Sequence, residues 1–261
     1  PPVLFDHVVL RGFELVVRPR PDAAPVELDV EALEARLDPA TRMVDVEGKG
    51  RFDDLPWELA GRLGTYERLF EVHDVEQALF GTQLSVAWIR AFPSASWSTL
   101  MHAAYLSYYP ILAAAPLGLW FAGRRTASRA AVLAMMSTFY ACYAVFFLFP
   151  VAGPRYSFAM AENAATAVPL AVFSHRFLEL GSAWGTAFPS SHVAAALVAA
   201  VCAWRGWRRL GAVLLVAAAL LTLATVYCQF HYGIDALCGV VVAALVLSLL
   251  REPRADARAR E

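Results

Sequence analysis

The stretch 210–229, LGAVLLVAAALLTLATVYCQ, and the stretch 233–250 just after it, GIDALCGVVVAALVLSLL, decide the fold class. The first contains no charged residue and the second contains only Asp235. A transmembrane helix needs about 20 mostly apolar residues to cross roughly 30 Å of hydrocarbon. The two stretches therefore predict two membrane spans. Three similar runs upstream predict three more, at 100–122, 130–150 and 190–204.

The composition agrees with a membrane protein. Hydrophobic residues make up 59% of the 261 residues and charged residues 17%, whereas soluble domains have about 45–50% and 25%. Such a chain is too apolar to be disordered, and its net charge of −1 argues against a nucleic-acid binder that works through net basicity. The four cysteines have no close paired spacing, so they indicate neither a zinc site nor a disulfide framework.

The arginines predict how the spans are oriented. Cytoplasmic loops carry an excess of Lys and Arg, and alternating crossings put three arginine clusters of this chain on one side. The opposite side receives the connection 151–187 and the turn near 229–233. We therefore expect an integral membrane protein, in the inner (plasma) membrane of a bacterium, with its polar connections on the periplasmic or extracellular side. The three clusters are Arg124, Arg125 and Arg129; Arg205, Arg208 and Arg209; and Arg251, Arg254, Arg258 and Arg260.

The expected class is an all-α, polytopic transmembrane helix bundle. Residues 98–250 form its catalytic core, residues 251–261 a basic cytoplasmic tail, and residues 1–97 a polar and amphipathic region with partly interfacial helices. Within that region we expect an interfacial helix or the end of a span at 3–17, a short helix at 28–37, a turn-rich stretch at 38–64 and surface helices at 65–92. A sixth span at about 78–97 is an open alternative.

Ionisable residues gather at the non-cytoplasmic ends of the spans. Such residues are costly near a membrane core and are functional candidates for that reason. Arg155 follows the second span, His192 opens the third, and His231 and Asp235 open the fifth. Asp235 follows His231 by four residues, so a helix is expected to place both on one face. The carboxylate can then accept a hydrogen bond from one imidazole nitrogen and leave the other as a nucleophile or base. The alternative is a His–Asp pair that only caps a helix.

The other polar residues suit a phosphate. Ser190 or Ser191 is expected to cap the helix that follows, and a helix N-terminus attracts anions. His192, in its first turn, can donate a proton to a leaving oxygen, and Arg155 can hold a phosphate through two parallel hydrogen bonds. The alternatives are an ordinary capped helix and an arginine that contacts lipid headgroups. Together the residues suit phosphoryl transfer, which depends on positioning and charge stabilisation.

The chain contains three short motifs in this order: GPR at 153–155, PSSH at 189–192 and HYGID at 231–235. They resemble those of the type-2 phosphatidic acid phosphatase superfamily. The resemblance implies that Arg155 holds phosphate together with the serine motif, in which Ser190 and His192 match the family's serine and histidine. It also implies that His192 protonates the leaving group, that His231 forms a phosphohistidine and that Asp235 orients His231. No metal or cofactor is implied.

The chain departs from the family pattern at several positions. Leu148 stands where the first motif has lysine, and Thr225 stands where the third has arginine. Ser191 replaces the usual glycine, and no proline follows Arg155. Two of three expected phosphate-binding cations are thus missing. These weakened flanking motifs also resemble the phosphotransferase branch, which includes inositol phosphorylceramide synthases and sphingomyelin synthases.

The expected function is that of a lipid-phosphate phosphohydrolase acting through a phosphohistidine. The substrate would be a membrane phospholipid or a polyprenyl phosphate in the bilayer, and no nucleic acid is involved. One alternative is a phosphotransferase that moves a phospho-headgroup to a lipid alcohol, since both reactions share the same intermediate. Another is a catalytically degenerate membrane protein or transporter, to which Leu148 and Thr225 point.

Overall fold

The computed structural model describes residues 7–17, 26–37, 43–52, 55–65, 72–181 and 185–250. It divides the chain into two compact units, Pro1–Glu71 and Val72–Glu261. Expectations for the tail at 251–261 lie outside the described residues.

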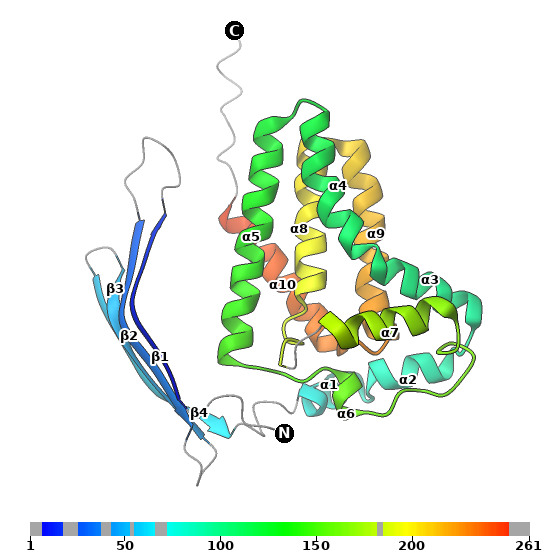
Figure 1. Ribbon diagram of the computed structural model, residues 1–261, viewed down its shortest axis with the longest axis horizontal. Coiled ribbons are helices and arrows are strands. Elements are labelled where there is room, and N and C mark those ends of the chain that lie inside the picture. The colour runs from blue at the N-terminus through cyan, green and yellow to red at the C-terminus, as the bar shows by residue number, and fades with distance from the viewer. Residues whose placement is uncertain are drawn as a thin grey trace. The chain divides into compact units, whose positions relative to one another are not determined.

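The first unit contains a four-stranded sheet (Figure 1). Neighbouring strands are also neighbours in sequence and pair antiparallel, which makes the sheet a meander. The strands are β1 (His7–Val17), β2 (Val26–Leu37), β3 (Met43–Phe52) and β4 (Leu55–Thr65).

This sheet corrects the all-α prediction. The helices expected at 3–17 and 28–37 are wrong for the described residues, because β1 occupies 7–17 and β2 occupies 28–37. The turn-rich stretch at 38–64 contains β3 and most of β4. In β2 the apolar residues at 26, 28 and 30 alternate with acidic residues at 27, 29 and 31. A period of two is typical of a half-buried strand, and Val30 is indeed buried.

The second unit is helical. Its helices are α1 (Val72–Phe80), α2 (Leu84–Ala91), α3 (Ala95–Leu106), α4 (Tyr108–Phe121), α5 (Arg125–Leu148), α6 (Pro154–Ser157), α7 (Pro169–Gly181), α8 (Ser191–Gly206), α9 (Arg208–Tyr227) and α10 (Gly233–Leu249).

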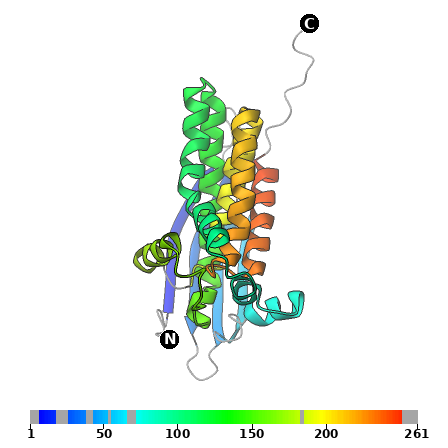
Figure 2. The ribbon, with the colours of Figure 1, turned by 90° about the vertical axis from the view of Figure 1, so that its right-hand side faces the viewer.

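Helix α8 is the centre of this unit and packs against α4, α5, α9 and α10 (Figures 1 and 2). Its buried positions are mostly alanine, including Ala194, Ala199 and Ala203. Small side chains let neighbouring helices approach closely, as they do in membrane bundles. The sequence SHVAAALVAAV therefore suits the middle of a helix bundle.

The five predicted apolar runs are helical, but not every one of these helices is long enough to cross a membrane. Two helices, α5 and α9, are long and apolar enough to cross a membrane, and α4, α8 and α10 are shorter apolar helices. The first run is split at Ser107 into α3 and α4. A sixth continuous span at 78–97 is wrong, because α2 has only 8 residues and the chain leaves helical geometry before and after it.

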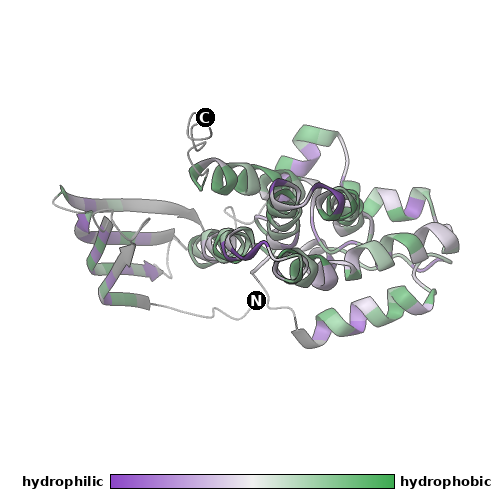
Figure 3. Ribbon diagram, turned by 90° about the horizontal axis from the view of Figure 1, so that it is seen from above, coloured by the Kyte–Doolittle hydropathy of each residue, from purple (hydrophilic) through white to green (hydrophobic). Residues whose placement is uncertain are grey.

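Many large apolar side chains of the helices are exposed, for example Leu133, Val213 and Leu245, and hydrophobic colouring prevails along the helices (Figure 3). Only 28% of the most apolar window of α5 is buried, and only 44% of that of α9. A soluble core helix would bury most of such a window, whereas a helix that is apolar all round needs an apolar environment.

The arginine-rich turns lie at one end of the bundle. The guanidinium of Arg124, in the turn between α4 and α5, donates to the carbonyl of Gly206 at the end of α8. Arg205 donates to the carbonyl of Leu247 near the end of α10 at 3.4 Å. Helices α8 and α10 both begin at the opposite end, where His192 and His231 lie.

Candidate active site

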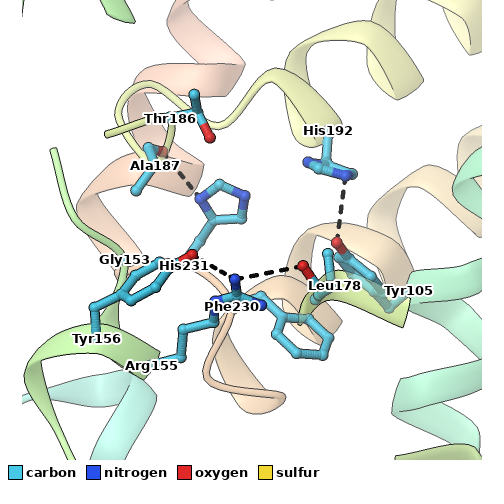
Figure 4. Close-up of a pocket in the computed structure, with 10 residues that line it drawn as sticks. All are labelled: Tyr105, Gly153, Arg155, Tyr156, Leu178, Thr186, Ala187, His192, Phe230 and His231. Atoms are coloured by element: carbon cyan, nitrogen blue, oxygen red, sulfur yellow. Dashed lines mark hydrogen bonds between the residues drawn. The ribbon is translucent and has the colours of Figure 1, made fainter. Parts of the chain in front are cut away.

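A small cavity lies at the end of the bundle where α8 and α10 begin (Figure 4). Its volume of about 40 Å³ could hold roughly three water molecules, since one needs about 10–15 Å³. A cavity of this size suits a single phosphate-sized group. Its ten lining residues are Tyr105, Gly153, Arg155, Tyr156, Leu178, Thr186, Ala187, His192, Phe230 and His231.

Two loops from distant parts of the chain are joined beside this cavity. The amide of Val151 donates to the carbonyl of Gly185, and the amide of Ala187 donates to the carbonyl of Val151, both at 3.1 Å. Gly185 has a φ of +86°, and a Cβ there would lie 2.9 Å from Cβ of Pro150. Only glycine fits both requirements. This junction holds the GPR segment next to the PSSH segment.

A tight turn after α9 presents His231. The carbonyl of Thr225 accepts hydrogen bonds from the amides of Phe230, at 3.1 Å, and His231, at 3.0 Å. Gln229 has a left-handed φ of +61°. Its side-chain oxygen also accepts from the amide of Ala161 at 3.3 Å. Left-handed backbone in a residue other than glycine is uncommon and often marks a functional turn.

The surroundings of His231 determine which nitrogen faces the cavity. Nδ1 of His231 lies 3.0 Å from the carbonyl oxygen of Ala187 and donates to it. A neutral imidazole with hydrogen on Nδ1 keeps the lone pair on Nε2. Burial lowers the pKa of His231 to about 4, and the hydrogen bond to Ala187 opposes this shift. At neutral pH the ring is therefore uncharged, which is the form that can attack phosphorus.

Asp235 lies near this ring. Its Oδ2 is 3.5 Å from Nδ1 of His231 and accepts a hydrogen bond from the amide of Tyr232 at 2.8 Å, which caps the start of α10. His231 precedes α10, so a shared helix face does not bring the two together. The carbonyl of Ala187 is the closer partner of Nδ1. An orienting role for Asp235 stays a prediction.

His192 faces the cavity from the first turn of α8. Its Nε2 lies 3.3 Å from the hydroxyl of Tyr105, and its ring centroid is 5.7 Å from that of His231. Nδ1 of His192 is buried and has no hydrogen-bond partner among the described residues. One nitrogen is thus held by a tyrosine, while the other is buried without a partner in the part of the chain that the structure describes.

The two serines lie beside the cavity but do not line it. The predicted cap is confirmed, because Oγ of Ser190 accepts from the amide of Val193 at 3.4 Å. Ser191 is the first residue of α8. Phosphate binding by either serine stays a prediction.

Arg155 is the only one of the ten lining residues with a permanent charge. Its guanidinium donates to the hydroxyl of Tyr156 and, at 3.4 Å, to the carbonyl of Leu178, and lies 4.5 Å from the centre of the Tyr156 ring. Within the described part of the chain, no carboxylate lies at ion-pair distance from Arg155. The cavity therefore has a positive charge that is available to an anion.

The two positions that depart from the family pattern do not line this cavity. Leu148 ends α5 with 41% of its surface exposed. Thr225 is buried in α9 and its hydroxyl donates to the carbonyl of Thr222 at 2.7 Å. No side chain at either position adds a charge to the cavity.

Sequence reasoning missed two groups that contact the histidines. Tyr105 lies in an apolar run, where a tyrosine gives little signal. The carbonyl of Ala187 belongs to the backbone and has no signature in the residue types. Only the position of Ala187, shortly before the PSSH motif, could have pointed to it.

The comparison with protein families agrees with this site. The family model described as the PAP2 superfamily matches residues 71–249, which include every helix of the second unit. The chain therefore belongs to the PAP2 superfamily, that is, the type-2 phosphatidic acid phosphatases and their relatives, as the three motifs predict. No curated protein and no solved structure matches the chain.

Proposed function

We propose that the protein is an integral membrane enzyme that hydrolyses a lipid phosphate through a phosphohistidine intermediate. The observation that carries this proposal is the convergence of Arg155, His192 and His231, from three distant segments, on one phosphate-sized cavity. Membership of the PAP2 superfamily supports a phosphatase or phosphotransferase activity.

The proposed reaction has two steps. Nε2 of His231 attacks phosphorus as the P–O bond to the lipid breaks, and His192, which enters the step as the protonated imidazolium, gives a proton to the departing oxygen. Arg155 balances the negative charge that the phosphoryl oxygens carry. Water then attacks the phosphohistidine and passes a proton to His192, which releases phosphate and restores both rings.

Release of inorganic phosphate by the purified protein in detergent tests this proposal. The substrates are phosphatidate, phosphatidylglycerophosphate and a polyprenyl diphosphate, and His231→Ala is the matched inactive control. We expect release from at least one of these lipids by the wild type and from none by the variant. Equal release by both proteins would show that a contaminant is responsible. No release from any lipid would refute hydrolysis and would leave transfer to a lipid alcohol or the non-catalytic alternative.

Transfer to a lipid alcohol is the second candidate, and one observation favours it. Arg155 is the only permanent cation that lines the cavity. A phosphodiester carries one negative charge, whereas a phosphomonoester carries up to two, so a single cation balances a diester better. Adding ceramide or another lipid alcohol together with a phosphodiester donor distinguishes the two reactions. A new phospholipid without free phosphate would indicate transfer.

For the membrane, we propose that the arginine-rich turns face the cytoplasm and the cavity faces the opposite side. The positive-inside rule and the position of these turns at the end away from the cavity support this orientation. Single cysteines at the exposed positions Glu162 and Thr126, in a background without the four native cysteines, test it. An impermeant thiol reagent should label the first in intact cells and not the second. The reverse pattern would place the cavity in the cytoplasm.

A further inference from the structure

A buried carboxylate outside the cavity connects two helices of the second unit. Glu76, in α1, has no exposed surface, although the rest of α1 is largely exposed. Buried carboxylates are rare unless they are paired. Glu76 was not a candidate in the sequence, because it lies in an amphipathic segment where an acidic residue is unremarkable.

The partners of Glu76 are backbone amides at the starts of two helices. Oε1 accepts from the amide of Leu84, the first residue of α2, at 3.0 Å. Oε2 accepts from the amide of Ile234, the second residue of α10, at 3.2 Å. One side chain thus satisfies amides that have no partner within their own helices.

A carboxylate suits this position better than a neutral group. Both of its oxygens accept hydrogen bonds, and its negative charge interacts favourably with the positive ends of α2 and α10. A glutamine would offer one oxygen and one NH₂ group, and the NH₂ group would face a backbone amide that is also a donor. One of the two helix starts would then lose its partner.

The contact with α10 is tight and close to the catalytic turn. A Cβ on Gly233 would lie 3.0 Å from Leu84 and 3.3 Å from Phe80, which shows that α1 and α2 press directly on the first residue of α10. Gly233 is two residues after His231 and two residues before Asp235. The backbone that Glu76 holds is therefore continuous with the backbone that presents the proposed nucleophile.

We propose that Glu76 is a positioning residue, which fixes the start of α10 and thereby holds His231 in line with the cavity. This inference rests on the proposed function, because it assigns Glu76 to the site of that reaction. It gives α1 and α2 a role in the chemistry, although neither helix contributes a side chain to the cavity.

The test compares Glu76→Gln with the wild type, and Glu162→Gln, an exposed glutamate of the same unit, is the matched control. Two quantities are measured on folded protein in detergent: kcat and KM for phosphate release, and hydrogen exchange of the backbone segment 230–236. We expect Glu76→Gln to lower kcat at least tenfold, to change KM less than threefold and to speed exchange of the segment. Glu162→Gln should change neither quantity.

Three results would overturn the inference. These are faster exchange with normal kcat, lower kcat with unchanged exchange, and no effect on either. If Glu76→Gln does not fold, Glu76→Asp, which keeps the charge, replaces it under the same criteria. If the wild type releases no phosphate from any lipid, the proposed function fails. The positioning role of Glu76 is then tested by the affinity of the protein for orthovanadate, a mimic of five-coordinate phosphorus. A variant with faster exchange should then bind orthovanadate at least tenfold more weakly, and unchanged affinity would reject the positioning role.

Discussion

Replacement of Arg155 by alanine tests whether this residue holds the phosphate. The guanidinium lines the cavity, and its partners are a tyrosine hydroxyl, the face of that tyrosine ring and a backbone carbonyl. None of these neutralises its charge. If a phosphoryl group is its true partner, removal of the guanidinium should weaken the transition state rather than the fold.

The size of the effect follows from the exposure of Arg155. Removal of one partner from a fully buried ion pair costs roughly 3–5 kcal/mol. Arg155 is only partly buried, so water screens part of the interaction and the lower end of that range applies, about 3 kcal/mol. At 1.36 kcal/mol for each factor of ten, this is roughly a 100-fold loss in kcat/KM. Arg155→Lys should recover only part of it, because lysine lacks the two-pronged geometry.

The assay is phosphate release from the best lipid substrate, with Arg176→Ala as the control. Arg176 is exposed on α7 and does not line the cavity, so its removal alters the net charge equally without touching the site. We expect near-normal activity for Arg176→Ala. A loss below tenfold for Arg155→Ala, in protein that is still folded, would refute the phosphate-binding role. Arg155 would then be an interfacial arginine that contacts headgroups.

Three further predictions concern the rings around the cavity. His231→Ala should abolish turnover, whereas His192→Ala should spare substrates with good leaving groups; phosphate trapped on His192 in a radiolabelling experiment would reverse these roles. The pKa of His231 is lowered to about 4 by burial, so the neutral nucleophile should persist as the pH falls and kcat/KM should decline only below about pH 5. An acid limb near pH 6.5 would contradict this and would mean that the carboxylate of Asp235 offsets the effect of burial. Tyr105→Phe removes the hydroxyl 3.3 Å from Nε2 of His192 and should lower kcat roughly 5- to 10-fold, the equivalent of one neutral hydrogen bond of about 1–1.5 kcal/mol; a larger effect on KM than on kcat would instead make Tyr105 a substrate-binding residue.

The helices of the second unit could be predicted because their signal is local and strong. The end of α9 was expected at 229 and is at Tyr227, and α10 was expected at 233–250 and is Gly233–Leu249. An apolar run of this length has few alternatives to a helix. The local signal of the sheet in the first unit is weaker: β2 alternates apolar and acidic residues over only a few positions, and the stability of the sheet depends on strands paired across it. In β3, Gly48 and Gly50 suggest turns, yet they are the residues that leave room for the ring of Trp57 on β4.

Some residues of the site could likewise be predicted from the sequence, and others could not. Arg155, His192 and His231 could be found because their side chains carry the chemistry, and their spacing matches known motifs. Glu76 and Tyr105 could not, since a glutamate on an amphipathic helix and a tyrosine in an apolar run are ordinary in those places. Only the fold brings Glu76 to the amides of α10 and Tyr105 to the ring of His192.

The choice of the attacking nitrogen depends on the backbone. The residue types suggest that Asp235 sets the tautomer of His231, but the carbonyl of Ala187 is the nearer acceptor, at 3.0 Å against 3.5 Å. That carbonyl is held in place because Ala187 and Val151 are joined by a hydrogen bond, while the carbonyl of Thr225 fixes the amide of His231. Both anchors are main-chain groups, so the side chains at these positions can vary without changing which nitrogen faces the cavity. A search for this geometry in other sequences should therefore look for loops at the same distances in sequence from the two histidines, in addition to an aspartate four residues after the second one.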